Sequence, residues 1–344
     1  MKIIEVAASK TYQVHIGSGL LPTLGQQVKT VSKARKIALV SDSNVFPLYG
    51  EAARKSLLGA GLEVVEFVFP AGEESKNGAT YLQLLNFLAE NKLTRSDCLI
   101  ALGGGVVGDL TGFAAATYLR GISYVQVPTT LLAAVDSSVG GKTAIDLDAG
   151  KNLCGAFWQP SLVLCDIDTL NTLPDEVFCA GCAEVIKYGV LYDPQLFDHL
   201  TQFGLEFHRE SVISRCVELK RNVVMEDEFD TGARMKLNLG HTIGHAIEAN
   251  SNFTISHGQA VAIGMAIVAK ASGCPCADEI IGTIMKFRLP TTTDFTAEAL
   301  CDVALSDKKR FGATINLIIP AAIGDCQIRS LPVEDLKSFI EAGL

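Results

Sequence analysis

The sequence predicts an α/β protein in which a mainly parallel sheet, covered by helices on both faces, precedes a mostly α-helical C-terminal domain. Three observations predict this class. Short apolar runs alternate with helical periodicity up to about residue 170, polar or glycine-rich turns follow those runs, and helical periodicity dominates afterwards. We therefore expect two domains, at residues 1–170 and 171–344.

The expected strands of the first domain are short apolar runs that end in polar, proline or glycine residues, as buried parallel strands do. They lie at residues 36–40, 64–69, 98–102, 124–128 and 162–165. Helical stretches such as residues 80–91 lie between them. In the second domain we expect helices at residues 175–191, 210–227, 241–250 and 257–272, then a hairpin at residues 313–320 and 325–330.

The composition fits such a fold and narrows the possible partners. Of the 344 residues, 48% are hydrophobic and 31 are glycine, as expected of a well-buried α/β protein. The net charge is −9 and no basic tract occurs, which argues against nucleic-acid binding but not against a small anionic ligand. We expect a small-molecule substrate and no nucleic-acid partner.

The apolar segments and the cysteines indicate the compartment. Met1–Glu5 has no signal-peptide apolar region, and the longest apolar run, residues 260–269, is too short to cross a bilayer. We therefore expect a cytoplasmic protein with no membrane partner and with ten reduced cysteines. The patterns Cys179–Cys182 and Cys274–Cys276 lack a second pair at zinc-ribbon spacing, so we give both structural or incidental roles.

The third predicted strand ends in a glycine-rich turn. Gly103, Gly105 and Gly108 satisfy the pattern G-x-G-x-x-G. Glycine lets backbone N–H groups approach a pyrophosphate, whose charge is favoured by the N-terminus of the following helix. Acidic residues at other strand ends, Asp42 and Glu73, could accept hydrogen bonds from ribose hydroxyls. The turn predicts a dinucleotide site, although an ordinary glycine turn would give the same short pattern.

A second glycine segment, residues 140–143, has the GGKT end of a P-loop. Asp136 stands where the first glycine of that motif is required, which argues against an NTPase. Lys142 can still bind a substrate phosphate through its ammonium charge.

Three of the six histidines, His241, His245 and His257, fall within seventeen residues. Neutral imidazole is a common ligand of Zn²⁺, and His241 and His245 share one helical face. A carboxylate from elsewhere would complete an open catalytic site with these residues and His257, which begins the next predicted helix. The alternative is that they are ordinary helical histidines.

Two further lysines have unusual positions. Lys220 interrupts an apolar helical stripe, and Lys187 follows Glu184 at the i, i+3 spacing of an ion pair. A snorkelling lysine and a surface ion pair are the alternative readings. Together with the glycine turn and the histidines, these cations predict a metal- and nicotinamide-dependent enzyme acting on a small anionic polyol or keto acid.

At this point the motifs resemble those of the 3-dehydroquinate synthases, members of the sugar-phosphate cyclase superfamily. The resemblance covers nearly the whole chain, from Pro70 to the segment that ends at Lys309. Its most specific stretches are Gly103–Thr111, Arg120–Gly121, Val127–Leu132, Asp136–Thr143, Gly150–Asn152, Ala183–Gly189 and Leu237–Glu248.

The resemblance implies a Rossmann-like N-terminal domain, a helical C-terminal domain, NAD⁺, a divalent metal such as Zn²⁺ or Co²⁺, and a homodimer. The implied enzyme is a lyase of the shikimate pathway, which leads to chorismate and the aromatic amino acids. It converts 3-deoxy-D-arabino-heptulosonate 7-phosphate to 3-dehydroquinate and phosphate. The implied steps are transient oxidation by NAD⁺, phosphate elimination, re-reduction and intramolecular aldol closure.

The resemblance also implies site residues by matching motifs. The metal ligands would be Glu184, His241 and His257, which replaces the pairing of His241 with His245. The NAD⁺ positions would be Asp42, Glu73, Lys76, Gly104, Gly105, Val106, Asp109, Thr129, Thr130, Lys151 and Thr172. The substrate and proton-transfer positions would be Asp136, Lys142, Asn152, Lys187, Lys220, Arg234, Asn238, His245 and Lys309, with Arg120 reaching the neighbouring subunit's site.

One position departs from the family pattern, and other activities stay open. Asp230 replaces the usual glutamate of the run before the histidine motif, so its carboxylate reaches one methylene less far. The alternatives are another cyclase such as a 2-deoxy-scyllo-inosose synthase, a metal-dependent alcohol or glycerol dehydrogenase, and a nucleotide-binding regulatory protein.

Overall fold

The computed structural model describes residues 1–252, 254–307 and 313–344. The chain divides into two compact units. The first comprises Met1–Leu173 with Lys220–Phe229, and the second comprises Pro174–Leu219 with Asp230–Leu344. Within the described ranges, no helix has the length and hydropathy that crossing a membrane would require.

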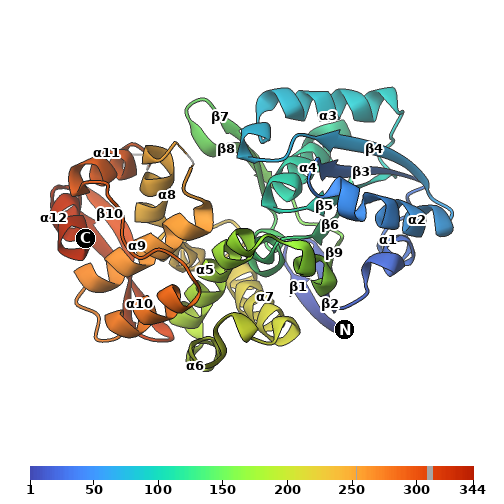
Figure 1. The fold of residues 1–344 in the computed structure, drawn as a ribbon. Coiled ribbons are helices and arrows are strands. Elements are labelled where there is room, and N and C mark those ends of the chain that lie inside the picture. The colour runs from blue at the N-terminus through green and yellow to red at the C-terminus, as the bar shows by residue number, and fades with distance from the viewer. Residues whose placement is uncertain (253, 308–312) are drawn as a thin grey trace. The chain divides into compact units, whose positions relative to one another are not determined.

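All residues of the first unit are described, and a seven-stranded sheet forms its centre (Figure 1). In spatial order the strands are β1 (Lys2–Ala7), β2 (Thr11–Gly17), β9 (Leu162–Asp166), β6 (Ser123–Pro128), β5 (Cys98–Gly103), β3 (Lys36–Asp42) and β4 (Glu63–Phe69). Only the β1–β2 pair is antiparallel. The predicted parallel sheet is therefore confirmed.

Helices cover both faces of this sheet. Their bounds are α1 (Leu24–Val31), α2 (Glu51–Gly59), α3 (Gly78–Glu90) and α4 (Gly105–Thr117). Leu39 of β3 packs with α1 and α2, whereas its neighbour Val40 packs with α3 and α4. This alternation explains why the strands are apolar along their whole length, since each face of the sheet buries side chains.

The strand order changes direction beside β3. The chain runs from β3 outward to β4 and then returns to β5 on the other side of β3. Ser41 pairs with Leu102 in the parallel β3–β5 register, so Asp42 and Gly103 end at the same edge of the sheet. Ligands of open α/β sheets bind at such a point, beyond the carboxyl ends of the strands.

Four strands of the first unit, all of whose residues are described, were not predicted. Because β1 and β2 precede the others, the glycine turn follows the fifth strand of the chain and not the third. The other two form an antiparallel hairpin, β7 (Lys142–Leu147) and β8 (Gly150–Phe157). Lys142 therefore begins a strand and not the helix that a P-loop would require.

The second unit is mostly helical, as predicted. Its helices are α5 (Asp175–Tyr192), α6 (Pro194–Phe203), the first part of α7 (Arg209–Glu226), α8 (His241–Asn250), α9 (His257–Ala271), α10 (Ala277–Lys286), α11 (Ala297–Asp307) and α12 (Leu336–Gly343). The predicted hairpin is β10 (Thr314–Ala322) with β11 (Asp325–Pro332). All ten cysteines are free thiols.

Two glycines bring α9 unusually close to its neighbours. A Cβ on Gly258 would lie 1.9 Å from the carbonyl oxygen of Ala180 on α5. A Cβ on Gly264 would lie 2.1 Å from the carbonyl oxygen of Gly240, which precedes α8. Any larger residue would push the helices apart, so these contacts let α9 pack closely against both α5 and the start of α8.

Candidate metal centre and nucleotide-binding edge

Three side chains from three helices of the second unit converge. Glu184 lies in the middle of α5 and is fully buried, while His241 and His257 are the first residues of α8 and α9. Glu184 Oε1 lies 3.4 Å from His241 Nε2 and 3.3 Å from His257 Nε2. This geometry fits a metal ion held by one carboxylate and two imidazoles, with further positions open.

The other ring nitrogen of each histidine has a partner that fixes its role. His241 Nδ1 lies 3.0 Å from the carbonyl oxygen of Leu239, and His257 Nδ1 lies 3.1 Å from Glu248 Oε2. Because both partners accept hydrogen bonds, each Nδ1 carries the proton and each Nε2 can present its lone pair. Glu184 Oε1 has no hydrogen-bond donor in the part of the chain that is described. Such buried lone pairs around one point fit a cation.

The charges nearby prepare these groups for a metal ion. Burial raises the pKa of Glu184, but Lys187 and His241 outweigh this effect and hold it well below its usual value. Burial and the Lys187 ammonium lower the pKa of His241 to about 4. Burial also lowers the pKa of His257, but the carboxylates of Glu184 and Glu248 raise it to about 9.

Glu248 is a residue whose role the sequence analysis did not assign. It lies two helical turns after His241 on α8, which places it on the same face, and it is almost fully buried. That spacing was the signal that could have found it. Its hydrogen bond to His257 is the arrangement that orients imidazole ligands in metal sites.

We expect Glu248→Gln to weaken metal binding by about tenfold to a hundredfold, as loss of such orienting carboxylates usually does. Glutamine keeps the size of the side chain but removes the charge that favours the Nδ1 proton of His257. Competition for Zn²⁺ with a chromophoric chelator would measure the affinity. Glu279→Gln, an exposed glutamate of α10, is the matched control. Equal affinity in the two variants would contradict this role.

Three other predicted residues of the second unit, Lys187, Arg234 and Asn238, are close in sequence to the ligands. Lys187 follows Glu184 by one turn, is buried, and forms an ion pair with Glu184 Oε2. Arg234 and Asn238 belong to a 3₁₀ turn, Ala233–Asn238, that leads into α8, and Arg234 is buried. Lys309 lies outside the described residues.

His245 lies beside both imidazoles of this centre. Its ring centroid lies 5.5 Å from that of His241 and 6.0 Å from that of His257. Among the described residues, its metal-ligating atoms group with Glu248 and His257, whereas Glu184 groups with His241 and His257. Helical spacing alone paired His241 with His245, whereas the group of possible ligands that contains Glu184 joins His241 to His257.

The first unit brings the glycine turn and the end of β6 together. Within α4 the first hydrogen bond runs from Gly108 N to Gly104 O, so the three preceding N–H groups have no partner within the helix. A Cβ on Gly104 would lie 3.0 Å from Thr130 Cγ2. Thr129 N donates to Gly103 O at 3.0 Å. Bare backbone, free helical N–H groups and two threonines thus share one edge, as a pyrophosphate site requires.

A charged cluster adjoins this edge, and we call it the Lys76 cluster: Glu73, Lys76, Asp109, Asp146 and Asn152. Nζ of the buried Lys76 lies 2.6 Å from Glu73 Oε1, 3.5 Å from Asp109 Oδ2, 3.7 Å from Asp146 Oδ1 and 2.8 Å from Asn152 Oδ1. Burial lowers the pKa of Lys76, but these carboxylates raise it above its usual value. Burial raises the pKa of Asp109 to about 7. Asp146 is the member that the sequence analysis missed.

The remaining predicted residues of the first unit lie at several places. Lys151 Nζ is 3.9 Å from Glu73 Oε1, beside the Lys76 cluster. Asp42 Oδ1 accepts the backbone N–H groups of Asn44 and Val45, which fixes the turn after β3. Val106 lies in the first turn of α4, and the Thr172 hydroxyl is hydrogen-bonded to the Tyr49 hydroxyl. Lys220 Nζ forms an ion pair of 2.8 Å with Asp136 Oδ1. Two residues are exposed: Lys142, at the start of β7, and Arg120, which has a φ of 67°.

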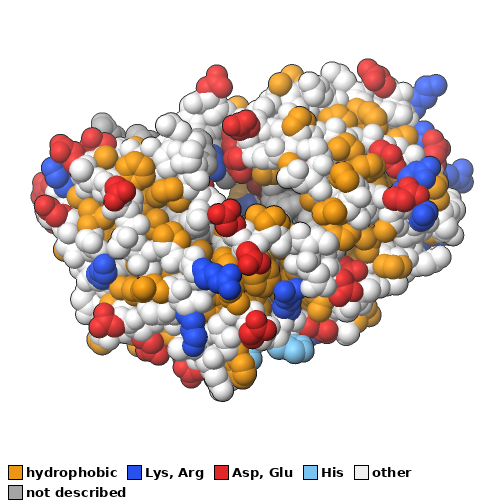
Figure 2. Space-filling model, in the orientation of Figure 1, with side chains coloured by type: hydrophobic (Ala, Val, Ile, Leu, Met, Phe, Trp, Pro, Cys, Tyr) orange, Lys and Arg blue, Asp and Glu red, His pale blue; other side chains and the backbone are white. Residues whose placement is uncertain are grey.

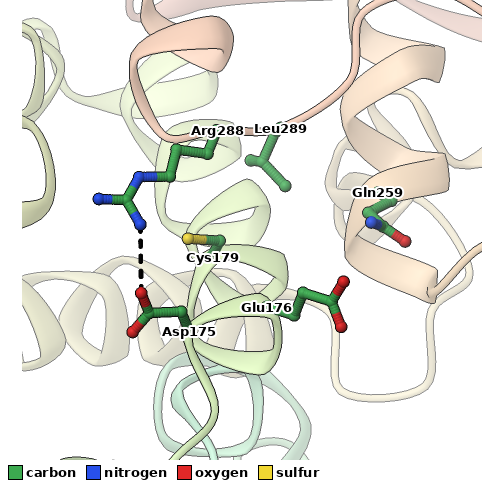
Figure 3. Close-up of a pocket in the computed structure, with 6 residues that line it drawn as sticks. All are labelled: Asp175, Glu176, Cys179, Gln259, Arg288 and Leu289. Atoms are coloured by element: carbon green, nitrogen blue, oxygen red, sulfur yellow. Dashed lines mark hydrogen bonds and ion pairs between the residues drawn. The ribbon is translucent and has the colours of Figure 1, made fainter.

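A separate pocket lies in the second unit at the first turn of α5 (Figure 3). Its volume is about 160 Å³, and an ion pair of 3.2 Å joins Arg288 and Asp175 at its rim. It is lined by Asp175, Glu176, Cys179, Gln259, Arg288 and Leu289, none of which belongs to the predicted site.

The charges on one face of the molecule can be seen in Figure 2. On the face of the molecule seen in Figure 2, acidic and basic side chains are interspersed, and no continuous basic area is visible. A nucleic-acid-binding face would gather its lysines and arginines.

Comparison with known proteins gives the family. Family models described as 3-dehydroquinate synthase N-terminal and C-terminal match residues 66–180 and 181–310. The 3-dehydroquinate synthase of Enterococcus faecalis is 43% identical over 352 residues, covering 99% of this chain and 98% of that protein. The chain belongs to the 3-dehydroquinate synthase family. A second member, from Pelobacter propionicus, is 46% identical over 98% of this chain and 99% of its own.

Several solved structures are also similar to this member of the 3-dehydroquinate synthase family. A 2-deoxy-scyllo-inosose synthase complexed with carbaglucose-6-phosphate, NAD⁺ and Co²⁺ has a TM-score of 0.89 at 25% identity over 100% of both chains. A 2-epi-5-epi-valiolone synthase from Streptomyces hygroscopicus, with NAD⁺ and Zn²⁺ bound, has a TM-score of 0.87 at 25% identity over 99% and 98% of the chains. A glycerol dehydrogenase from Schizosaccharomyces pombe, at 18% identity and a TM-score of 0.67 over 98% and 91%, shares the fold.

Asp230, where this chain departs from the family pattern, has an unusual backbone conformation. Asp230 has a φ of 58°, in the left-handed region. Aspartate enters this region more readily than most residues that carry a Cβ. The shorter carboxylate at this position therefore suits the backbone that carries it.

Proposed function

We propose that this protein is a 3-dehydroquinate synthase that uses NAD⁺ and a divalent metal ion, Zn²⁺ or Co²⁺. It would convert 3-deoxy-D-arabino-heptulosonate 7-phosphate to 3-dehydroquinate and phosphate, within the shikimate pathway. The observation that carries the proposal is the convergence of Glu184, His241 and His257 on one point. Full-length identity of about 43% to curated 3-dehydroquinate synthases supports the choice of reaction.

Hydride transfer and Lewis-acid catalysis would depend on different residues. When bound, NAD⁺ would accept a hydride from the carbon that bears a substrate hydroxyl and later return it, and the metal ion would act as a Lewis acid on the oxygen of that hydroxyl. Glu184, His241 and His257 would hold the metal ion. The N–H groups at the start of α4 would bind the pyrophosphate, and the rest of NAD⁺ would be bound and oriented by Asp42, Glu73, Lys76, Asp109, Lys151 and Thr172.

The remaining predicted residues would bind the substrate. Arg234 offers a planar fork of donors that matches a carboxylate, and Lys220 would assist it. Lys187, beside Glu184, would hold substrate oxygens near the metal ion, and His245 would move a proton at the phosphate end. The other phosphate and polyol contacts would be Asp136, Lys142, Asn152, Asn238 and Lys309.

We also propose that the enzyme is a cytoplasmic homodimer. Free thiols at all ten cysteines fit a reducing compartment. Arg120 is exposed on a backbone with positive φ and is followed by Gly121, also at positive φ. An exposed arginine at such a turn suits a contact with the neighbouring subunit's site.

A phosphate-release assay with the heptulosonate phosphate tests the function. Phosphate should appear only when NAD⁺ and one divalent metal are present, and NADH absorbance should show no net rise because the hydride returns to the substrate. Chelation should abolish phosphate release, and added Zn²⁺ should restore it.

Each alternative predicts a different result. A metal-dependent alcohol or glycerol dehydrogenase would accumulate NADH, and a regulatory protein would bind NAD⁺ without releasing phosphate. Undiminished activity in a metal-free preparation would contradict the metal site.

A further inference from the structure

Asp146 lies at an irregularity of the β7–β8 hairpin. Ile145 pairs with Cys154, and the next pair is Leu147 with Gly150, so the register shifts at Asp146. Residues 151–153 of β8 therefore lie opposite the single residue Asp146. Such bulges re-aim side chains and recur next to active sites. Here the bulged residues include two that the proposed function uses, Lys151 and Asn152.

The backbone of Asp146 ties this bulge to the segment after β4. Its N–H donates to the carbonyl oxygen of Lys76 at 2.7 Å, and an isolated parallel bridge joins it to Asn77. The hairpin is therefore attached to the nucleotide-binding edge at the residue that carries the Lys76 ammonium.

The side chain of Asp146 fixes the bulge from the other side. Its Oδ1 accepts the backbone N–H of Asn152 at 2.8 Å and lies 3.7 Å from Lys76 Nζ. Lys76 Nζ in turn donates to Asn152 Oδ1 at 2.8 Å. Asp146, Lys76 and Asn152 thus close a ring of contacts in which Asp146 holds the backbone and Lys76 holds the side chain.

Asn152 needs this support because of its backbone. Its φ is 57°, in the left-handed region, which asparagine enters more readily than most residues with a Cβ. The conformation still costs free energy and persists when the surroundings enforce it. The hydrogen bond from Asn152 N to Asp146 Oδ1 is such an enforcing contact. Without it, we expect the bulge to relax and Lys151 and Asn152 to lose their fixed positions.

We propose that Asp146 is a positioning residue of the nucleotide-binding edge. By holding the bulge of β8 against Lys76, it orders Lys151 for the cofactor and fixes Asn152 beside it. The inference rests on the proposed function in assigning NAD⁺ as the ligand of this edge. Asp146 touches no reacting group in this account and acts through Asn152 and Lys76.

Two substitutions separate positioning from charge. Asp146→Ala removes the acceptor for Asn152 N–H, and Asp146→Asn keeps an acceptor oxygen but removes the negative charge. We expect the NAD⁺ dissociation constant of the full-length protein to rise about tenfold in Asp146→Ala, as loss of one hydrogen bond to a charged group does. In Asp146→Asn it should stay within about threefold of the wild-type value, since the acceptor remains. Calorimetric titration with NAD⁺ measures both.

Asp148→Ala is the matched control, because Asp148 lies in the same hairpin, two residues on, and is exposed. Its NAD⁺ affinity should equal that of the wild type. Zn²⁺ content and thermal unfolding should be unchanged in all three variants, which separates a local effect from misfolding. Wild-type affinity in Asp146→Ala, or an equal loss in Asp146→Asn, would overturn the positioning role.

Hydrogen exchange tests the same contact without cofactor. Peptides covering residues 148–153 should exchange faster in Asp146→Ala than in Asp148→Ala and the wild type, and unchanged exchange would also overturn the inference. If the wild-type protein bound no NAD⁺, the proposed function would fail instead, and the exchange result would still decide whether Asp146 holds the bulge.

Discussion

Replacing Glu184 by glutamine should remove the metal ion from the purified protein and reduce phosphate release by at least about a thousandfold. The amide cannot supply the negative charge that the two imidazoles lack. A metal ion contributes several kcal/mol to such a reaction, and about 1.4 kcal/mol corresponds to a factor of ten in rate. Metal analysis of the dialysed protein and the phosphate-release assay measure the two effects.

Glu176→Gln is the control for this experiment. Glu176 lies on the same helix, α5, but is exposed at its first turn and belongs to the separate pocket. The control should keep one metal ion per chain and wild-type activity. Stoichiometric metal in Glu184→Gln, or full activity without metal, would remove the basis of the proposed centre.

Replacing Arg234 by alanine should lower kcat/KM for the heptulosonate phosphate by about a hundredfold or more, the loss expected when one partner of a buried charge pair is removed. Arg234 is almost fully buried on the turn that leads into α8. It is the residue to which we assign the substrate carboxylate, a group that the substrates of 2-deoxy-scyllo-inosose synthases lack. Arg234→Lys should retain part of the activity, because it keeps the charge but loses the fork of donors.

Two measurements make the Arg234 experiment specific. Inhibition by inorganic phosphate and metal content should be unchanged in Arg234→Ala, because neither involves the carboxylate. Arg329→Ala, an exposed arginine of β11, should behave as the wild type. Normal turnover of the heptulosonate phosphate by Arg234→Ala would count against this substrate and favour another sugar-phosphate cyclase.

The sequence predicted the elements whose pattern is strong and local. The five apolar runs of the first domain became β3, β4, β5, β6 and β9, and the long periodic segments of the second became α5, α7, α8 and α9. The other four strands escaped because their residues do not form continuous apolar runs. Burial alternates along β1, and most of β8 is at least partly exposed. Such strands depend on pairing partners that a short sequence window does not contain.

Some residues of the candidate site could likewise be predicted from local sequence, and others could not. The glycine turn could be read directly, because a turn between a strand and a helix is a local feature of the chain. The histidines could be recognised as ligands by residue type, but helical spacing alone paired His241 with His245. Motif resemblance supplied Glu184, more than fifty residues earlier in the chain. Neither approach gave Glu248 or Asp146 a role, since each acts through a partner that only folding brings near.

By itself, the sequence determined the fold class of each half of the chain and the residue types available for its chemistry. Those follow from hydrophobic period and side-chain identity, which are local properties. Only the tertiary structure decided that Glu184 Oε1 meets the Nε2 atoms of His241 and His257, because that depends on how closely α9 packs against α5 and α8. Gly258 and Gly264 allow this approach, since any side chain there would collide with the neighbouring backbone.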